Sequence, residues 1–238
     1  EAAEYASRID LSTVASGYYT ATGAYGKGVR GGDIKYLDLN GDNIVNGGKG
    51  TLDDPGDRRV IGNSSPRYQY GASLNFSWYG FDVSVFMQGI GRLDWYPGAD
   101  NLRFWGPYCR PYATFVPKNF MSQVWSEENP DAYFPRARAY TSLNSNSGTA
   151  YYTNDRYLQN LAYCRLKNLT IGYTIPRRLT SKVGIKECRI YFSGENLATW
   201  SALKSDFLDP EQAAADSDKK ANVYPWCKTY SIGLNLTF

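Results

Sequence analysis

The sequence predicts an all-β protein and, more specifically, part of an antiparallel transmembrane β-barrel. Its composition is typical of β-sheets, since 16% of the 238 residues are aromatic and the chain holds 21 tyrosines and 23 glycines. Apolar and polar residues alternate along five segments, which places apolar side chains on one face of each expected strand. The connections between these segments are alternately short and long, as they are in outer-membrane barrels.

The first two expected strands cover residues 68–79 and 81–88. Apolar side chains occupy the even positions from Tyr70 to Trp78 in the first segment and mainly the odd positions of the second. Only Gly80 separates the two segments, so we expect a tight hairpin.

The other three expected strands cover residues 165–175, 190–196 and 230–238. The first of them ends at Pro176, because proline cannot donate a hydrogen bond to a sheet. The second is shorter and less regular. The last alternates as far as Phe238.

The connections 90–164 and 200–229 are long, whereas the others are short. A barrel explains this arrangement, with short periplasmic turns and long outer loops. A soluble β-sandwich is the alternative, but it would carry two long loops at one end, which is uncommon. Aromatic residues also fall near the strand ends, where a membrane barrel carries interfacial girdles: Trp78, Tyr79, Tyr173, Trp200 and Tyr230.

Composition excludes several functional classes. The formal net charge of +3 argues against a nucleic-acid partner, and the absence of histidine removes Ser/His/Asp and Cys/His catalysis. A glycosidase that uses two carboxylates needs no histidine. The strand residues Asp82 and Glu195 are the candidates, but nothing in the sequence indicates that they face each other. We therefore expect no enzymatic activity. The start at Glu1, without Met or signal peptide, indicates a mature or internal start.

The four cysteines are scattered singly and form no Cys-x-x-Cys pair. They are interpreted as isolated thiols. The alternative is that one or two disulfides form in an oxidising compartment. Three pairings are compatible with the sequence. The residues are Cys109, Cys164, Cys188 and Cys227.

Several blocks resemble the carboxy-terminal region of the SusC/RagA family of TonB-dependent outer-membrane transporters. The blocks are residues 32–42, 57–71, 80–89, 165–176, 193–197 and 230–238. The resemblance implies a barrel of about 22 strands closed by an amino-terminal plug. Five strands cannot close such a barrel, so we expect a C-terminal portion of it.

The expected organisation follows from the resemblance. Residues 1–67 form an extracellular loop, and residues 68–238 form the last barrel strands with the loops 90–164 and 200–229. The implied function is uptake of an oligosaccharide or oligopeptide by a multi-pass protein of the bacterial outer membrane. The implied partners are the plug and N-terminal strands of the same transporter, a SusD-like surface lipoprotein, TonB through the absent N-terminal part, and outer-membrane lipid.

A calcium-loop-like motif lies within the first expected loop. Oxygen-bearing residues at alternate positions, followed by a backbone carbonyl, match the first, third, fifth and seventh positions of an EF-hand-like loop. Asn43 takes the sixth position, where glycine is usual, because asparagine tolerates left-handed backbone. The matching residues are Asp38, Asn40, Asp42 and Ile44.

The end of this motif departs from the standard loop, because the twelfth position is Lys49, which cannot bind a cation. Compared with the family's shorter version, residues 47–56 look like an insertion. Asp57 would then supply the last carboxylate, and Asp53 or Asp54 could substitute. Calcium is the one cofactor we expect, and a metal-free acidic turn is the alternative. A calcium-stabilised secreted β-domain that binds glycans is the alternative to the transporter as a whole.

The 90–164 loop is dense in aromatic rings, which suit sugar faces, peptide side chains and protein interfaces. The rings are therefore divided among contacts with substrate, contacts with the lipoprotein and packing of the loop on itself. The candidate substrate contacts are Trp95, Tyr96, Trp105 and Tyr108.

Overall fold

The computed structural model divides the chain into two compact units. The loop unit comprises Glu1–Gly62 and Tyr96–Leu158, and the sheet unit comprises Asn63–Trp95, Gln159–Ala215 and Val223–Phe238. Parts of the three expected loops lie outside the described residues. The structure describes residues 1–14, 30–109, 116–137, 152–205, 208–215, 224 and 226–238.

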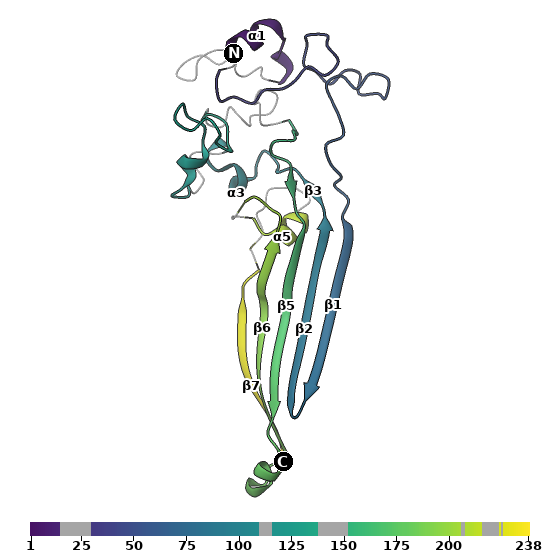
Figure 1. Ribbon diagram of the computed structural model, residues 1–238, viewed down its shortest axis with the longest axis vertical. Coiled ribbons are helices and arrows are strands. Elements are labelled where there is room, and N and C mark those ends of the chain that lie inside the picture. The colour runs from purple at the N-terminus through teal and green to yellow at the C-terminus, as the bar shows by residue number, and fades with distance from the viewer. Residues whose placement is uncertain (15–29, 110–115, 138–151, 206–207, 216–223, 225) are drawn as a thin grey trace. The chain divides into compact units, whose positions relative to one another are not determined.

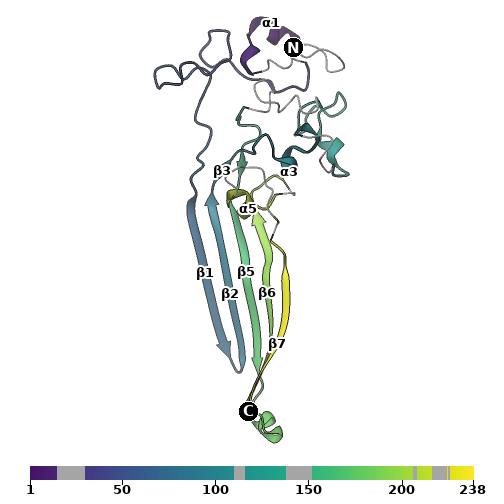
Figure 2. The ribbon, with the colours of Figure 1, turned by 180° about the vertical axis from the view of Figure 1, so that it is seen from behind.

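The sheet unit contains one five-stranded antiparallel sheet with the strand order β1-β2-β5-β6-β7 (Figures 1 and 2). Each of the five expected strands is present and confirmed. The strands β2, β5 and β6 run further than the sequence pattern predicts. Their bounds are Arg67–Trp78 for β1, Phe81–Arg92 for β2, Tyr163–Thr174 for β5, Glu187–Ser201 for β6 and Thr229–Thr237 for β7.

One face of this sheet is apolar from edge to edge. Phe76 pairs with Val83, Val83 with Ile171, Ile171 with Phe192, and Phe192 with Ile232. These five residues form a single row across all five strands, because register pairs in a sheet point to the same side. The row is open to the surroundings, since Phe76 and Ile232 are 56% and 83% exposed.

The opposite face is polar along the adjacent row. Asn75, Ser84, Thr170, Ser193 and Ser231 pair in sequence across the same five strands. The hydroxyls of Thr170 and Ser193 lie 3.2 Å apart and share a hydrogen bond. The sheet therefore separates an apolar surface from a polar one.

The two short connections lie at the same end of the sheet. Tyr79 and Gly80 both have positive φ, as a two-residue turn matching the twist of the strands requires. The backbone N–H of Thr174, at the end of β5, donates to the Gly80 carbonyl at 2.7 Å. The β5–β6 connection contains two helical turns, α4 (Arg177–Thr180) and η4 (Ser181–Val183).

Smaller elements complete the sheet unit. β3 (Asp94–Trp95) and β4 (Gln159–Asn160) form a two-stranded antiparallel pair, and the short helix α5 (Pro210–Ala215) follows β6. Of the cysteines, Cys164, Cys188 and Cys227 are free thiols. No helix among the described residues is long and apolar enough to span a membrane.

The loop unit has a small apolar cluster at its N-terminal part. Helix α1 (Ala2–Arg8) precedes Asp10, which bridges to Ile44 in parallel. Leu11, Val14 and Val45 are buried behind this bridge. The remaining elements of this unit are α3 (Leu102–Trp105), η1 (Gly106–Tyr108) and η2 (Phe120–Gln123).

Candidate functional site

A buried charge network lies on the polar face of the sheet, where β5 bulges. Phe86 and Met87 of β2 pair with Asn168 and Leu166, so Lys167 is an extra residue on β5 relative to β2. The register with β6 also shifts here, but in that pairing β6 has the extra residue, between Glu195 and Ala198. A bulge of this kind re-aims side chains. Here the charged groups of Arg165 and Lys167 meet the same carboxylate, that of Glu211, at 2.7 and 2.8 Å.

Arg165 is the centre of this network, and only 1% of the residue is exposed. Its Nη1 donates to Glu211, its Nη2 donates to Asp209, and its Nε donates to Thr199 Oγ1 at 2.9 Å. Gln88 donates to Glu211 at 3.2 Å. Each charge therefore has a partner, which burial of charged groups requires.

The sequence around α5 explains how its acidic residues reach the sheet. The Asp209 carboxylate accepts the backbone N–H groups of Glu211 and Gln212 at 3.0 and 3.2 Å, as a residue preceding a helix commonly does. Pro210 suits the first helical position. This local arrangement presents Asp209 and Glu211 together to Arg165.

A second ion pair lies on the polar face and spans three strands. Asp82 of β2 accepts from Nε of Arg189 of β6 at 2.9 Å, and a second bond joins its other oxygen to the same guanidinium. Gly172 of β5 pairs with Asp82, and a Cβ there would meet both charged side chains. Because Gly172 has no side chain, the Asp82–Arg189 ion pair can pass over β5.

The calcium-loop-like motif in the loop unit is held by its own backbone. The Asp38 carboxylate accepts the N–H groups of Gly41 and Asn43 at 2.6 and 2.8 Å. Asn43 has φ 64°, the left-handed backbone that the motif requires at its sixth position. Asp42 and Asn40 make equivalent short-range bonds within the loop.

Asp57 returns to the motif after the segment 47–56. Its two carboxylate oxygens accept the N–H groups of Leu39 at 2.6 Å and Asn46 at 2.8 Å. Asp54 is directed to Gly48 instead. In the described part of the chain, no three acidic or cysteine side chains form a group that could hold a metal ion. The oxygen atoms of this motif are hard donors of the kind that calcium prefers. Calcium binding stays a prediction, with the expected ligands Asp38, Asn40, Asp42, Ile44 and Asp57.

The four aromatic residues proposed as substrate contacts are all buried. Trp95, Tyr96, Trp105 and Tyr108 are 6%, 8%, 1% and 3% exposed. The centroids of the Trp105 and Tyr157 rings lie 5.0 Å apart, and those of Tyr108 and Phe134 lie 5.7 Å apart. For the three residues in the loop unit, this geometry supports the alternative that the rings pack on one another.

Hydrogen bonds hold Tyr96 in this interior. Its hydroxyl donates to the Tyr152 carbonyl at 3.2 Å and accepts from Asn154 at 2.8 Å. Burial raises the pKa of the Tyr96 hydroxyl well above its ordinary value. Trp95 belongs to the sheet unit, where it pairs with Gln159 across β3 and β4. None of the four presents an open ring face to a ligand in this structure.

The loop unit has a cavity of about 860 Å³, a volume suited to a small ligand. Its lining includes Tyr36 and Trp125, together with Arg59 and Asp155, which form an ion pair at 2.9 Å. Gly32, at φ 85°, lies against the Trp125 ring so closely that a Cβ would collide with it. The sequence pattern did not identify Tyr36, Trp125, Arg59 or Asp155 as site residues. The one local signal was the glycine pair Gly31–Gly32, which permits the close approach of the backbone to the Trp125 ring.

Comparisons with known proteins give relatives but no matching protein-family profile. The chain is 28% identical over 215 residues to TonB-dependent receptor P26 of Formosa agariphila, covering 87% of this chain and 20% of the receptor. It is 27% identical over 217 residues to TonB-dependent receptor P3 of the same organism, covering 87% and 19%. The chain thus spans about a fifth of the length of these relatives.

Two solved structures share the fold of this chain. The match to a structure of the RagAB peptide transporter has a TM-score of 0.55 and 25% identity, covering 76% of this chain and 18% of that one. A structure of the RagAB peptide importer in its open-open state matches with a TM-score of 0.52 and 21% identity, covering 85% and 20%. The latter likeness concerns the fold alone.

Proposed function

We propose that this chain forms the C-terminal barrel wall of an outer-membrane importer. The chain is homologous to part of the TonB-dependent receptors, so we assign it to a transport protein rather than an enzyme. The rest of the same transporter supplies the plug and the preceding strands of a barrel of about 22. The assembled protein crosses the bacterial outer membrane many times.

The row from Phe76 to Ile232 is the observation that carries this proposal. A soluble sandwich buries such a row under a second sheet, whereas a membrane barrel turns it toward lipid. The opposite polar row, with its ion pairs, suits a hydrated interior. The charges Arg165 and Asp82 both lie on that interior side, where a membrane protein tolerates them.

The two edges of the sheet also support closure by other strands. Among the described strands, β1 pairs only with β2 and β7 pairs only with β6. Each therefore leaves one row of backbone N–H and C=O groups open, which is a liability that a closed barrel removes. We propose that these edges join strands from the rest of the transporter.

The proposed cargo is an oligosaccharide or an oligopeptide. The resemblance to the SusC/RagA family supports both, and the match to the RagAB peptide transporter at 25% identity supports a peptide. We further propose a SusD-like surface lipoprotein as the outer partner, TonB as the energy-coupling partner of the remaining part, and calcium at the Asp38 loop.

Purification of the native protein from outer membranes in detergent tests the proposal. We expect it to be recovered with a plug-bearing barrel and a surface lipoprotein, and mass spectrometry of the co-purified ligand would identify the cargo. A soluble, monomeric chain that needs no detergent would contradict the barrel. In that case the secreted, calcium-stabilised glycan-binding domain would explain the sequence.

A further inference from the structure

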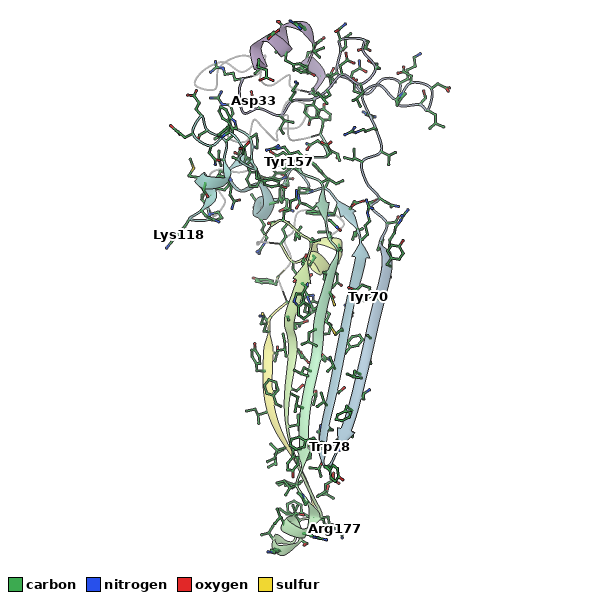
Figure 3. The ribbon with its side chains drawn as sticks, viewed as in Figure 1. Asp33, Tyr70, Trp78, Lys118, Tyr157 and Arg177 are labelled. Carbon is green, nitrogen blue, oxygen red and sulfur yellow. The ribbon has the colours of Figure 1, made fainter. Side chains whose placement is uncertain are left out.

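The turn between β5 and β6 differs from the β1–β2 turn at the same end of the sheet. The β1–β2 turn has only Tyr79 and Gly80, whereas the β5–β6 connection projects α4 and η4 beyond the strand ends (Figure 1). Figure 3 shows Arg177 beyond Trp78 at this end, with Tyr70 toward the other end. We call residues 176–186 the basic turn.

The basic turn concentrates positive charge at the surface. Arg177, Arg178, Lys182 and Lys186 are all exposed, and none of them forms an ion pair within the described residues. Its single acidic neighbour in sequence is Glu187. Four basic groups within ten residues favour an anionic surface as the partner.

Two large apolar side chains accompany these charges. Leu179 is 60% exposed and Val183 is 72% exposed, although the segment has a folded backbone. Leu179 lies in α4 and Val183 in the adjoining η4, so both apolar side chains belong to the same short helical segment as three of the four basic residues. The backbone is fixed by the N–H of Gly184, which donates to the Ser181 carbonyl at 3.2 Å, and by left-handed Gly184 at φ 75°.

The surroundings of the basic turn are those of a membrane interface. Trp78 and Tyr79, at the neighbouring hairpin, are 62% and 86% exposed, and such rings mark the boundary between lipid tails and head groups. The Lys186 N–H donates to the Thr237 carbonyl at 2.8 Å, which ties the turn to the end of β7. The turn is therefore attached to the end of the sheet at which the exposed rings of the hairpin lie.

We propose that the basic turn is a phospholipid-binding anchor. Leu179 and Val183 enter the boundary of the acyl chains, while Arg177, Arg178, Lys182 and Lys186 bind the phosphates of anionic phospholipids in the periplasmic leaflet. Combined apolar insertion and basic charge is the established physics of interfacial segments. This inference rests on the proposed function, because it requires the apolar face of the sheet to lie in a membrane.

The test uses the whole transporter that contains this chain, delipidated in detergent and titrated with phosphatidylglycerol or phosphatidylcholine. Native mass spectrometry counts the lipids that remain bound. We expect phosphatidylglycerol to bind at least about tenfold more tightly than phosphatidylcholine, and this preference to weaken as salt is raised. The variant R177Q/R178Q/K182Q/K186Q should lose the preference.

A matched control removes four exposed basic residues elsewhere. The variant K49Q/R103Q/K118Q/K228Q carries the same change in charge and should retain the preference for phosphatidylglycerol. Heat-modified migration on a gel verifies that each variant has a folded barrel. If the fourfold variant of the turn fails to fold, R178Q/K182Q replaces it, with a smaller loss of the preference expected.

Two results separate this inference from the proposed function. Equal binding of the two lipids by the natural protein, or a preference that survives in the turn variant, would overturn the anchor while leaving the barrel intact. A natural protein that retains neither lipid nor detergent would overturn the barrel itself. A preference lost equally in the control variant would assign it to overall charge and also overturn the anchor.

Discussion

Arg165 and Glu211 are separated by 46 positions in the chain, yet the Arg165 Nη1 donates to Glu211 Oε2 at 2.7 Å. The contact fastens the connection after β6 to the polar face of the sheet. Glu211 also receives Lys167 and Gln88, so this one carboxylate joins two strands to α5. Because the Arg165 guanidinium is buried, removal of either Arg165 or Glu211 leaves the other charge without this partner and destabilises the network.

Glu211→Ala should therefore loosen α5. It leaves Arg165 with only Asp209 as an acidic partner and removes the acidic partner of Lys167. Because Glu211 is partly exposed, we expect a loss of about 2 kcal/mol of local stability rather than the full value of a buried pair. Hydrogen exchange over residues 208–215 measures it. Gln212→Ala is the control, since only the backbone of Gln212 bonds to Asp209, and equal exchange in both variants would contradict the network's role.

Gly172→Ala should destabilise the sheet by about 1–3 kcal/mol, because the added methyl group would push Asp82 and Arg189 apart. Gly71→Ala is the matched substitution on the same polar face. A Cβ there meets its nearest atom at 3.7 Å, an ordinary contact. The midpoint of thermal unfolding in detergent compares the variants, and a Gly172→Ala midpoint equal to that of Gly71→Ala would refute the explanation.

Neighbouring residues of β7 test which face meets lipid. Ile232 belongs to the apolar row and Ser231 to the polar row. Ile232→Lys should cost about 2–4 kcal/mol, the penalty for lysine near the middle of a bilayer, whereas Ser231→Lys should cost little. Reversible unfolding from lipid vesicles gives both free energies. Similar costs for the two variants would place the apolar row outside the membrane.

Calcium should protect the loop unit from proteolysis, and chelation should remove that protection. Asp42→Asn keeps the shape of the side chain but removes its charge, so we expect calcium affinity to fall by about tenfold or more. Asp131→Asn is the control, because Asp131 is an exposed carboxylate of the same unit that lies outside the motif. Calorimetric titration measures both affinities. An unchanged affinity in Asp42→Asn would favour the metal-free acidic turn.

Strand β6 shows where a local pattern is too weak to fix an element. The sequence predicts only residues 190–196, yet β6 runs from Glu187 to Ser201. It includes Asn196 at φ 52°, a conformation that strands rarely contain. Pairing with β5 on one side and β7 on the other supplies the hydrogen bonds that extend it. Neighbouring strands thus override the irregular local pattern.

The sequence by itself determined that five strands exist and which residues share each face, although not how far each strand extends, because alternation has a period of two and needs no distant contact. Gly80 similarly determined a hairpin from local backbone freedom alone. Only the tertiary structure decided that Trp105 is interior and that Arg165 meets Glu211. Both depend on which distant segments pack together, and the same aromatic or charged residue suits an open surface as well as a partnered interior.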